Sequence, residues 1–144
     1  MVGGQMLDLL AEQQAGERSI GAITHLQRLK TGALISFSCT AGAILGKASD
    51  SLRMALAGYA HDLGLAFQIV DDILDVEGSA AELGKTAGKD AADDKPTYPS
   101  LFGLARARSM AAECADRAGA VLVEAGLTSG WLGGIADWII TRRN

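Results

Sequence analysis

The sequence predicts an all-α fold, and composition and hydrophobic periodicity are the observations behind this prediction. Hydrophobic residues make up 49% of the chain but aromatic residues only 5%, while Ala and Gly are abundant, which favours closely packed helices over a β-sandwich. Both prolines, Pro96 and Pro99, fall in one short segment, so long helices are permitted elsewhere. No segment keeps the alternating period of a strand. The 144 residues fit the size of one domain.

The first part of the chain is predicted to form helices over residues 3–14 and 20–29, with Ser19 as the N-cap of the second. At residues 30–32 a β-branched residue precedes glycine, which disfavours helix continuation, so we expect a kink or a break there. An uncharged run follows, over residues 31–46. It is shorter than a membrane span requires and carries hydroxyl side chains, so we interpret it as a buried core helix rich in small residues.

Three further helices are predicted over residues 50–76, about 97–125 and 131–141. Ser49 or Asp50 caps the first of these helices, which is expected to end at residues 77–78, where Gly78 terminates it. An irregular stretch continues to Pro96. Gly103 is expected to interrupt the next helix early.

One face of the predicted helix over residues 50–76 carries an acidic stripe. Positions i, i+3, i+4 and i+7 share a face, so the stripe spans about a 100° arc. Its members are Gln68, Asp71, Asp72 and Asp75. Apolar residues cover the remaining surface, and a buried carboxylate without a partner costs on the order of several kcal/mol. Carboxylates with no nearby His or Cys suit a hard cation such as Mg²⁺. The alternative is a solvated acidic cluster at a frayed helix end.

A lysine-rich segment follows the acidic stripe within a short distance. It contains Lys85, Lys89 and Lys95, interspersed with glycines that let the backbone approach a ligand. Carboxylates beside lysines are explained by a polyanion such as a diphosphate, which metal ions and ammonium groups would neutralise together. Taken alone, the lysines would favour a solvated surface loop, but their position directly after the acidic stripe favours the polyanion.

Other features exclude several classes of protein. A net charge of −4 gives no nucleic-acid-binding footprint, and no signal peptide or transmembrane segment is expected. Cys39 and Cys114 are unpatterned, which indicates reduced, buried thiols of a cytoplasmic protein. His25 and His61 are each isolated from other ligand types, so surface or packed histidines are the expected interpretation.

Four segments resemble, in order, motifs of the all-trans polyprenyl diphosphate synthases. They are Gly4–Leu9, Lys30–Leu34, Gly64–Asp75 and Gly84–Pro99. The third resembles the second aspartate-rich motif of that family. The similarity is greatest to bacterial short-chain members that make farnesyl or geranylgeranyl diphosphate. It implies that residues 1–144 are the C-terminal portion of the helical bundle of the isoprenoid synthases.

The resemblance also implies a reaction: isopentenyl diphosphate condenses head-to-tail with an allylic diphosphate through a Mg²⁺-assisted allylic carbocation. The metal ligands are then Asp71, Asp72 and Asp75, and the diphosphate-binding residues are Lys30, Lys85 and Lys95, with Gln5 and Asp8 in the site wall. The catalytic residues are Lys30, Thr31 and Gln68, of which Thr31 and Gln68 face the developing cation with their oxygens. Thr31 has an alternative interpretation as an N-cap. Lys89 is less well matched to the family pattern.

One family feature is missing from this sequence: the first aspartate-rich motif with its arginine pair. We therefore expect the 144 residues alone to lack condensation activity and to expose apolar helix faces. A non-catalytic helical subunit of a prenyltransferase complex is the main alternative, and a terpene cyclase relative is a weaker one. The resemblance implies a homodimer for the intact family member, whereas product chain length cannot be read from these residues.

Overall fold

The computed structural model describes Met6 and residues 28–83, 97–128 and 130–142. Its elements are a π-helical turn η1 (Arg28–Gly32) and the helices α3 (Ala33–Leu45), α4 (Asp50–Leu83), α5 (Tyr98–Phe102), α6 (Leu104–Glu124) and α7 (Trp131–Thr141). Every element in these ranges is helical, which confirms the predicted all-α fold. Apart from Met6 and the start of η1, the helices predicted over residues 3–14 and 20–29 lie outside the described residues. None of the helices in these ranges combines the length and the apolar character that a bilayer crossing requires.

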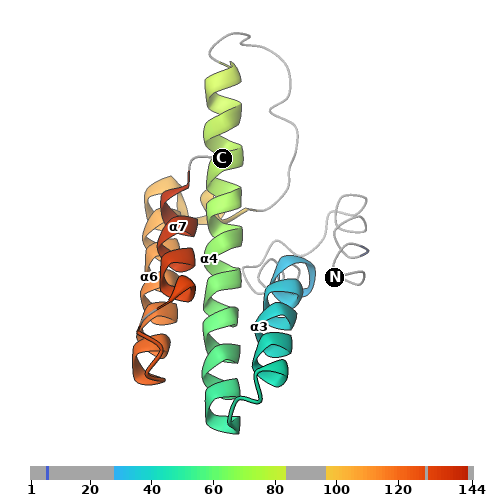
Figure 1. The fold of residues 1–144 in the computed structure, drawn as a ribbon. Helices are drawn as coiled ribbons and strands as arrows, with labels where there is room; N and C mark the ends of the chain where they lie inside the picture. The colour runs from blue at the N-terminus through green and yellow to red at the C-terminus, as the bar shows by residue number, and fades with distance from the viewer. Residues whose placement is uncertain (1–5, 7–27, 84–96, 129, 143–144) are drawn as a thin grey trace.

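Helix α4 is the central element of the fold. α3 lies on one side of it and α6 and α7 on the other (Figure 1). Its members of the hydrophobic core cluster recur at helical spacing: Tyr59, Leu63, Ala66, Ile69, Val70 and Ile73. The facing stripe of α6 consists mainly of small side chains, which allow the helices to approach closely: Ala107, Ala111, Cys114, Ala118 and Leu122. This core holds the acidic stripe of α4 in a fixed orientation.

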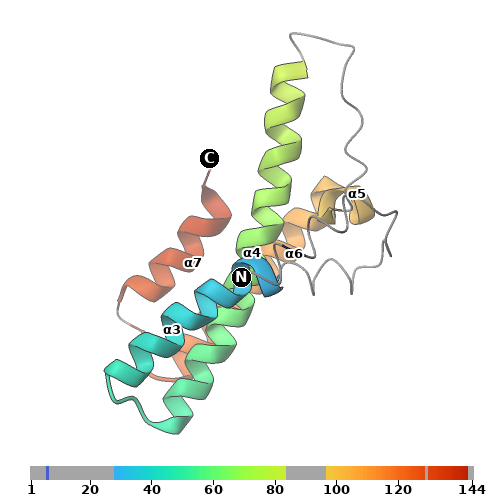
Figure 2. The same cartoon turned by 90° about the vertical axis from the view of Figure 1, so that its right-hand side faces the viewer.

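The predicted end of this helix at residues 77–78 is wrong. α4 continues through Gly78 to Leu83, and its last turns project beyond the neighbouring helices in both views (Figures 1 and 2). An interior glycine costs only about 1 kcal/mol of helix propensity. The alanines and glutamate that follow are good helix formers, so the helix propagates past the glycine.

The irregularity predicted at residues 30–32 is confirmed as the π-helical turn η1. A close approach to α4 accompanies it: a Cβ atom added to Gly64 would lie 3.2 Å from the Cα atom of Gly32. A side chain at position 64 would therefore require the backbone at Gly32 to move by a few tenths of an ångström. The two glycines therefore bring Thr31, the neighbour of Gly32, against the face of α4 that carries Gln68.

The helix predicted over residues 31–46 is present as α3, but its predicted burial in the core is wrong. Among the side chains of α3, only Ala43 is fully buried. Leu34, Phe37 and Leu45 are exposed, because α3 packs on α4 along one side and its other side meets no described residue. A run without charges indicates low polarity but does not tell which sides of the helix are covered.

The segment that leads into α6 turns at two well-defined points. Thr97 caps α5: its hydroxyl accepts a hydrogen bond from the Ser100 amide (3.3 Å), and the Ser100 hydroxyl accepts one from the Thr97 amide (2.9 Å). Gly103, with a φ of +80°, separates α5 from α6 (Figure 2). Both the start of this helix and its interruption at Gly103 are as predicted. The capping box fixes the adjacent Tyr98 amide, which faces α4.

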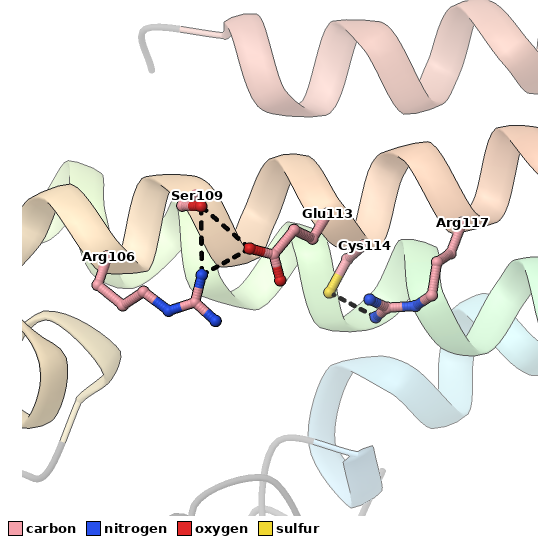
Figure 3. A network of polar contacts seen from close by, with 5 residues as sticks. All are labelled: Arg106, Ser109, Glu113, Cys114 and Arg117. Carbon is pink, nitrogen blue, oxygen red and sulfur yellow. Dashed lines mark hydrogen bonds and ion pairs between the residues drawn. The ribbon is translucent and has the colours of Figure 1, made fainter.

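Two arginines of α6 pair with acidic residues of α4. Arg117 donates two hydrogen bonds to Asp62 (2.9 and 3.2 Å) and Arg108 donates to Glu77. On the surface of α6, Arg106 and Ser109 donate to Glu113, and Arg117 also contacts the thiol of Cys114 (Figure 3). The bonds from Arg108 and Arg117 attach α6 to α4 at two separated points along α4.

The surroundings of several titratable groups in this region shift their pKa values. The hydrogen bond from Arg106 lowers the pKa of the Glu113 carboxyl. Burial raises the pKa of the thiols of Cys39 and Cys114, and both are free, as predicted. Cys114 is buried and Cys39 half-buried, while His61 is exposed on the surface of α4, so none of these groups is set up as a metal ligand in the described part of the chain.

Helix α7 is attached near its start by Tyr59, whose hydroxyl donates a 2.7 Å hydrogen bond to the carbonyl of Leu132. Burial, and secondarily the nearby Cys39, raises the pKa of Tyr59 to about 12. The unfolded chain deprotonates at the ordinary tyrosine value of about 10. The stabilisation that depends on protonated Tyr59 is therefore complete below pH 10 and is lost as the pH rises towards 12.

We predict that the free energy of unfolding falls more steeply between pH 10 and 12 in the wild type than in Tyr59→Phe. The chain has two tyrosines, so the difference between the tyrosinate absorbance of the wild type and that of Tyr59→Phe gives the titration of Tyr59 itself. Identical stability profiles in the two proteins over this range would contradict the prediction.

Candidate functional site

The acidic stripe lies on the second half of α4, where apolar residues flank it as predicted. Asp72 is buried with 7% of its surface exposed, Asp71 and Gln68 are half-buried, and Asp75 is exposed. Successive residues of a helix point about 100° apart, so the side chains of Asp71 and Asp72 leave the helix in different directions. Asp71 and Asp72 therefore lie in different environments.

Asp72 faces Gln68 and the start of α5. One of its carboxylate oxygens accepts a hydrogen bond from Nε2 of Gln68 (3.3 Å), and the other accepts from the backbone amide of Tyr98 (3.1 Å). Hydrogen bonds to an ionised acceptor are stronger than neutral ones. Asp72 therefore connects α4 to the capped turn before α6, in addition to any role towards a ligand.

Gln68 also connects α4 to η1. The hydroxyl of Thr31 donates to Oε1 of Gln68 over 3.1 Å, although the two residues are 37 positions apart. The alternative interpretation of Thr31 as an N-cap is wrong, because α3 has Gly32 at its N-cap and no side chain caps it. The structure thus brings together Thr31, Gln68 and Asp72 from the predicted site residues.

Asp71 points towards the C-terminal end of α7. Its carboxylate accepts a hydrogen bond from Nη2 of Arg142 at 3.1 Å. The guanidinium carbon of Arg142 lies 4.3 Å from the centre of the Phe67 ring, within the range of a cation–π contact. Sequence reasoning expected a cation at the stripe but missed this arginine, because the pair is 71 residues apart and no local pattern relates them.

The donor set of the stripe fits a hard divalent cation in chemistry but not as a closed cage. Asp71 and Asp75 are four residues apart on one accessible face of α4, and carboxylate oxygens are what Mg²⁺ prefers. In the described ranges, no three His, Cys, Asp or Glu side chains converge to hold a metal ion. Mg²⁺ is ordinarily held by one or two carboxylates together with waters and substrate phosphates, and two carboxylates on an open face suit that mode.

The remaining predicted site residues are not placed by the structure. Lys30 belongs to η1, directly before Thr31, but its side chain is not described. Gln5, Asp8, Lys85 and Lys95 lie outside the described residues, as does Lys89. Their roles stay predictions.

Comparisons with known proteins identify the family of this chain. The family model described as polyprenyl synthetase matches residues 1–120. The farnesyl diphosphate synthase of Escherichia coli (strain K12) is 44% identical over 148 aligned residues, which cover 99% of this chain and 48% of that protein. The dimethylallyltranstransferase of Fischerella ambigua (strain UTEX 1903) is 39% identical over 142 residues, covering 99% of this chain and 41% of the relative.

The fold is similar to that of solved structures as well. The apo crystal structure of an FPP/GFPP synthase from Zymomonas mobilis aligns with a TM-score of 0.77 at 40% identity, over 96% of this chain and 45% of the other. The chain therefore spans somewhat less than half the length of these relatives. The family match over residues 1–120 and the shared fold lead to one conclusion: the chain belongs to the polyprenyl synthetase family.

Proposed function

We propose that this chain is the C-terminal portion of a short-chain trans-prenyltransferase, which condenses isopentenyl diphosphate head-to-tail with an allylic diphosphate. In this proposal, α4 supplies the surface that binds the allylic diphosphate. The names of the relatives support it, because one is a farnesyl diphosphate synthase and the other a dimethylallyltranstransferase. A homodimeric assembly and a cytoplasmic location accompany the proposal as further expectations.

The hydrogen bond between Thr31 and Gln68 is the observation that carries the proposal. It joins two predicted site residues from separate elements beside the acidic stripe. Their oxygen dipoles can stabilise a developing allylic cation without trapping it, since a neutral hydroxyl or amide oxygen held in a hydrogen bond is a weak nucleophile. Such an arrangement is typical of a site that handles a carbocation next to a departing anion.

The diphosphate would be bound next to these oxygens by charge. Asp71 and Asp75, with Asp72 beside them, would hold Mg²⁺, and the lysines Lys30, Lys85 and Lys95 would neutralise the phosphate oxygens. When bound, the metal supplies Lewis-acid activation of the leaving group. Asp72 would additionally fix the orientation of Gln68 through its 3.3 Å hydrogen bond. Gln5 and Asp8 are proposed to line the site wall.

The proposal predicts that the chain binds inorganic diphosphate only when Mg²⁺ is present. Asp71→Asn should weaken this binding at least tenfold, because it removes a charged ligand while keeping the shape of the side chain; mutating even the outer partners of metal ligands typically costs about 10- to 100-fold. Isothermal titration calorimetry of diphosphate with and without Mg²⁺ measures both effects.

The matched control is Asp116→Asn, which makes the same change at an exposed aspartate of α6. This variant should bind like the wild type. Equal affinity of the wild type and Asp71→Asn, or binding that does not require the metal, would contradict the proposed function.

A further inference from the structure

The contacts of Arg142 are unusual for an arginine at the end of a helix. It is the C-cap residue of α7, and only 10% of its side chain is exposed, whereas the side chain of its partner Asp71 is 48% exposed. Arg108 and Arg117, which also pair with acids of α4, are each more than half exposed. Arg142 is thus the arginine that the fold buries most deeply of these three.

Two attractions hold the guanidinium group in place, and one of its donors lacks an acceptor. Nη2 donates to Asp71 while the face of the group lies on Phe67. Nε is buried, and among the described residues it has no hydrogen-bond partner. A buried donor without a partner destabilises the arrangement. The ion pair with Asp71 is therefore favourable, but the unsatisfied Nε offsets part of this stabilisation. Such a balance is expected where Arg142 can give up its contact with Asp71 to another cation.

The pair of Arg142 and Asp71 involves a residue of the candidate functional site. Asp71 is the first carboxylate of the stripe and, in the function proposed above, a metal ligand. We propose that Arg142 is the resident counter-cation of Asp71, that a divalent metal ion competes with it for this carboxylate, and that metal binding releases the C-terminal end of α7 from α4. This inference rests on the proposed function, because it takes Asp71 as a ligand of the metal.

The surroundings allow the exchange without disruption of the core. Arg142 and Thr141 line a cleft of about 630 Å³ between α4, α6 and α7. The backbone amide of Arg142 is bonded only to the last turn of its own helix, through the carbonyl of Trp138 (2.9 Å). Once Asp71 is engaged elsewhere, the side chain can move into this cleft while α7 stays attached near its start by the bond between Tyr59 and Leu132.

The test compares Mg²⁺ affinity in three variants of the 144-residue chain in the presence of inorganic diphosphate. Arg142→Gln removes the competitor and should tighten Mg²⁺ binding about tenfold, which corresponds to about 1.4 kcal/mol. Phe67→Leu leaves both charges in place but removes the ring under the guanidinium, so a smaller gain of about threefold is expected. Arg108→Gln makes the same charge change at the Glu77 pair and should leave the affinity unchanged.

Hydrogen exchange supplies a second measurement that does not depend on affinity. In the wild type, Mg²⁺ with diphosphate should speed up amide exchange over residues 138–142. In Arg142→Gln, exchange there should be fast already and should not respond to the metal. A variant that merely unfolds would show fast exchange in α6 as well, and Phe67→Leu then provides the independent comparison.

Each outcome decides between the possibilities. Mg²⁺ binding in Arg142→Gln that equals or falls below that of the wild type overturns the competition, since the arginine would then be neutral or supportive towards the metal site, while the proposed function stands. Tighter binding in Arg108→Gln to the same extent also overturns it, because a general charge effect would explain the gain. Absence of Mg²⁺-dependent diphosphate binding in the wild type and in Arg142→Gln alike contradicts the proposed function itself.

Discussion

Replacing Ile69 with alanine is expected to lower the free energy of unfolding by about 3 kcal/mol, within the range of about 2–5 kcal/mol seen for such core truncations. Ile69 is fully buried, with no exposed surface, and belongs to the core cluster in which α4 meets α6. The surrounding helices are held by side chains on several sides, so they cannot collapse into the cavity. Urea denaturation followed by circular dichroism measures the change.

Val76→Ala provides the matched control on the same helix. Val76 is 42% exposed, and its truncation should change the free energy of unfolding by no more than about 0.5 kcal/mol. If the two variants lost similar stability, Ile69 would not lie in a rigid core, and the burial of this face of α4 would be wrong.

Replacing Asp72 with alanine is expected to cost about 2–3 kcal/mol of stability, because it leaves the Tyr98 amide buried without this acceptor. Asp72→Asn keeps a carbonyl oxygen that can accept from the same amide, so it should retain most of the stability. The difference separates the hydrogen bond that Asp72 accepts from the charge that it carries. Thermal unfolding of both variants measures this difference.

The same pair of variants tests the role of Asp72 towards a ligand. If the carboxylate serves only the fold, Asp72→Asn should bind Mg²⁺ and diphosphate like the wild type; if it also holds the metal, affinity should fall as in Asp71→Asn. A stability loss in Asp72→Ala that did not exceed that of a surface substitution would contradict the bond to Tyr98 as a structural link.

Local patterns were sufficient to predict most helices of this fold. The periodic apolar positions of α4 and the capping signal at Ser49 act between residues a few positions apart. Ser49, for example, accepts a hydrogen bond from the Leu52 amide at 3.3 Å, as its place before the helix predicts. Interactions between residues this close in the sequence can be recognised without knowledge of the tertiary structure.

The predictions that were wrong concern information that lies outside the local sequence. The course of α4 past Gly78 depends on a small propensity difference. The exposure of Phe37 on α3 depends on which elements pack against it, and so does the pairing of Asp71 with Arg142. The periodicity correctly placed Asp71 and Asp72 on one helix, but only their tertiary partners show that one carboxylate meets an arginine and the other a backbone amide.

The separation of Asp71 and Arg142 along the chain has a consequence during protein synthesis. A ribosome that adds about 5–20 residues per second needs roughly 4–14 s to add the 71 residues from Asp72 to Arg142. For that interval the nascent chain carries the carboxylate of Asp71 without the guanidinium that later covers it. Water and intracellular divalent cations therefore reach this carboxylate before Arg142 exists, and the arginine arrives at a position that a metal ion has been able to visit first.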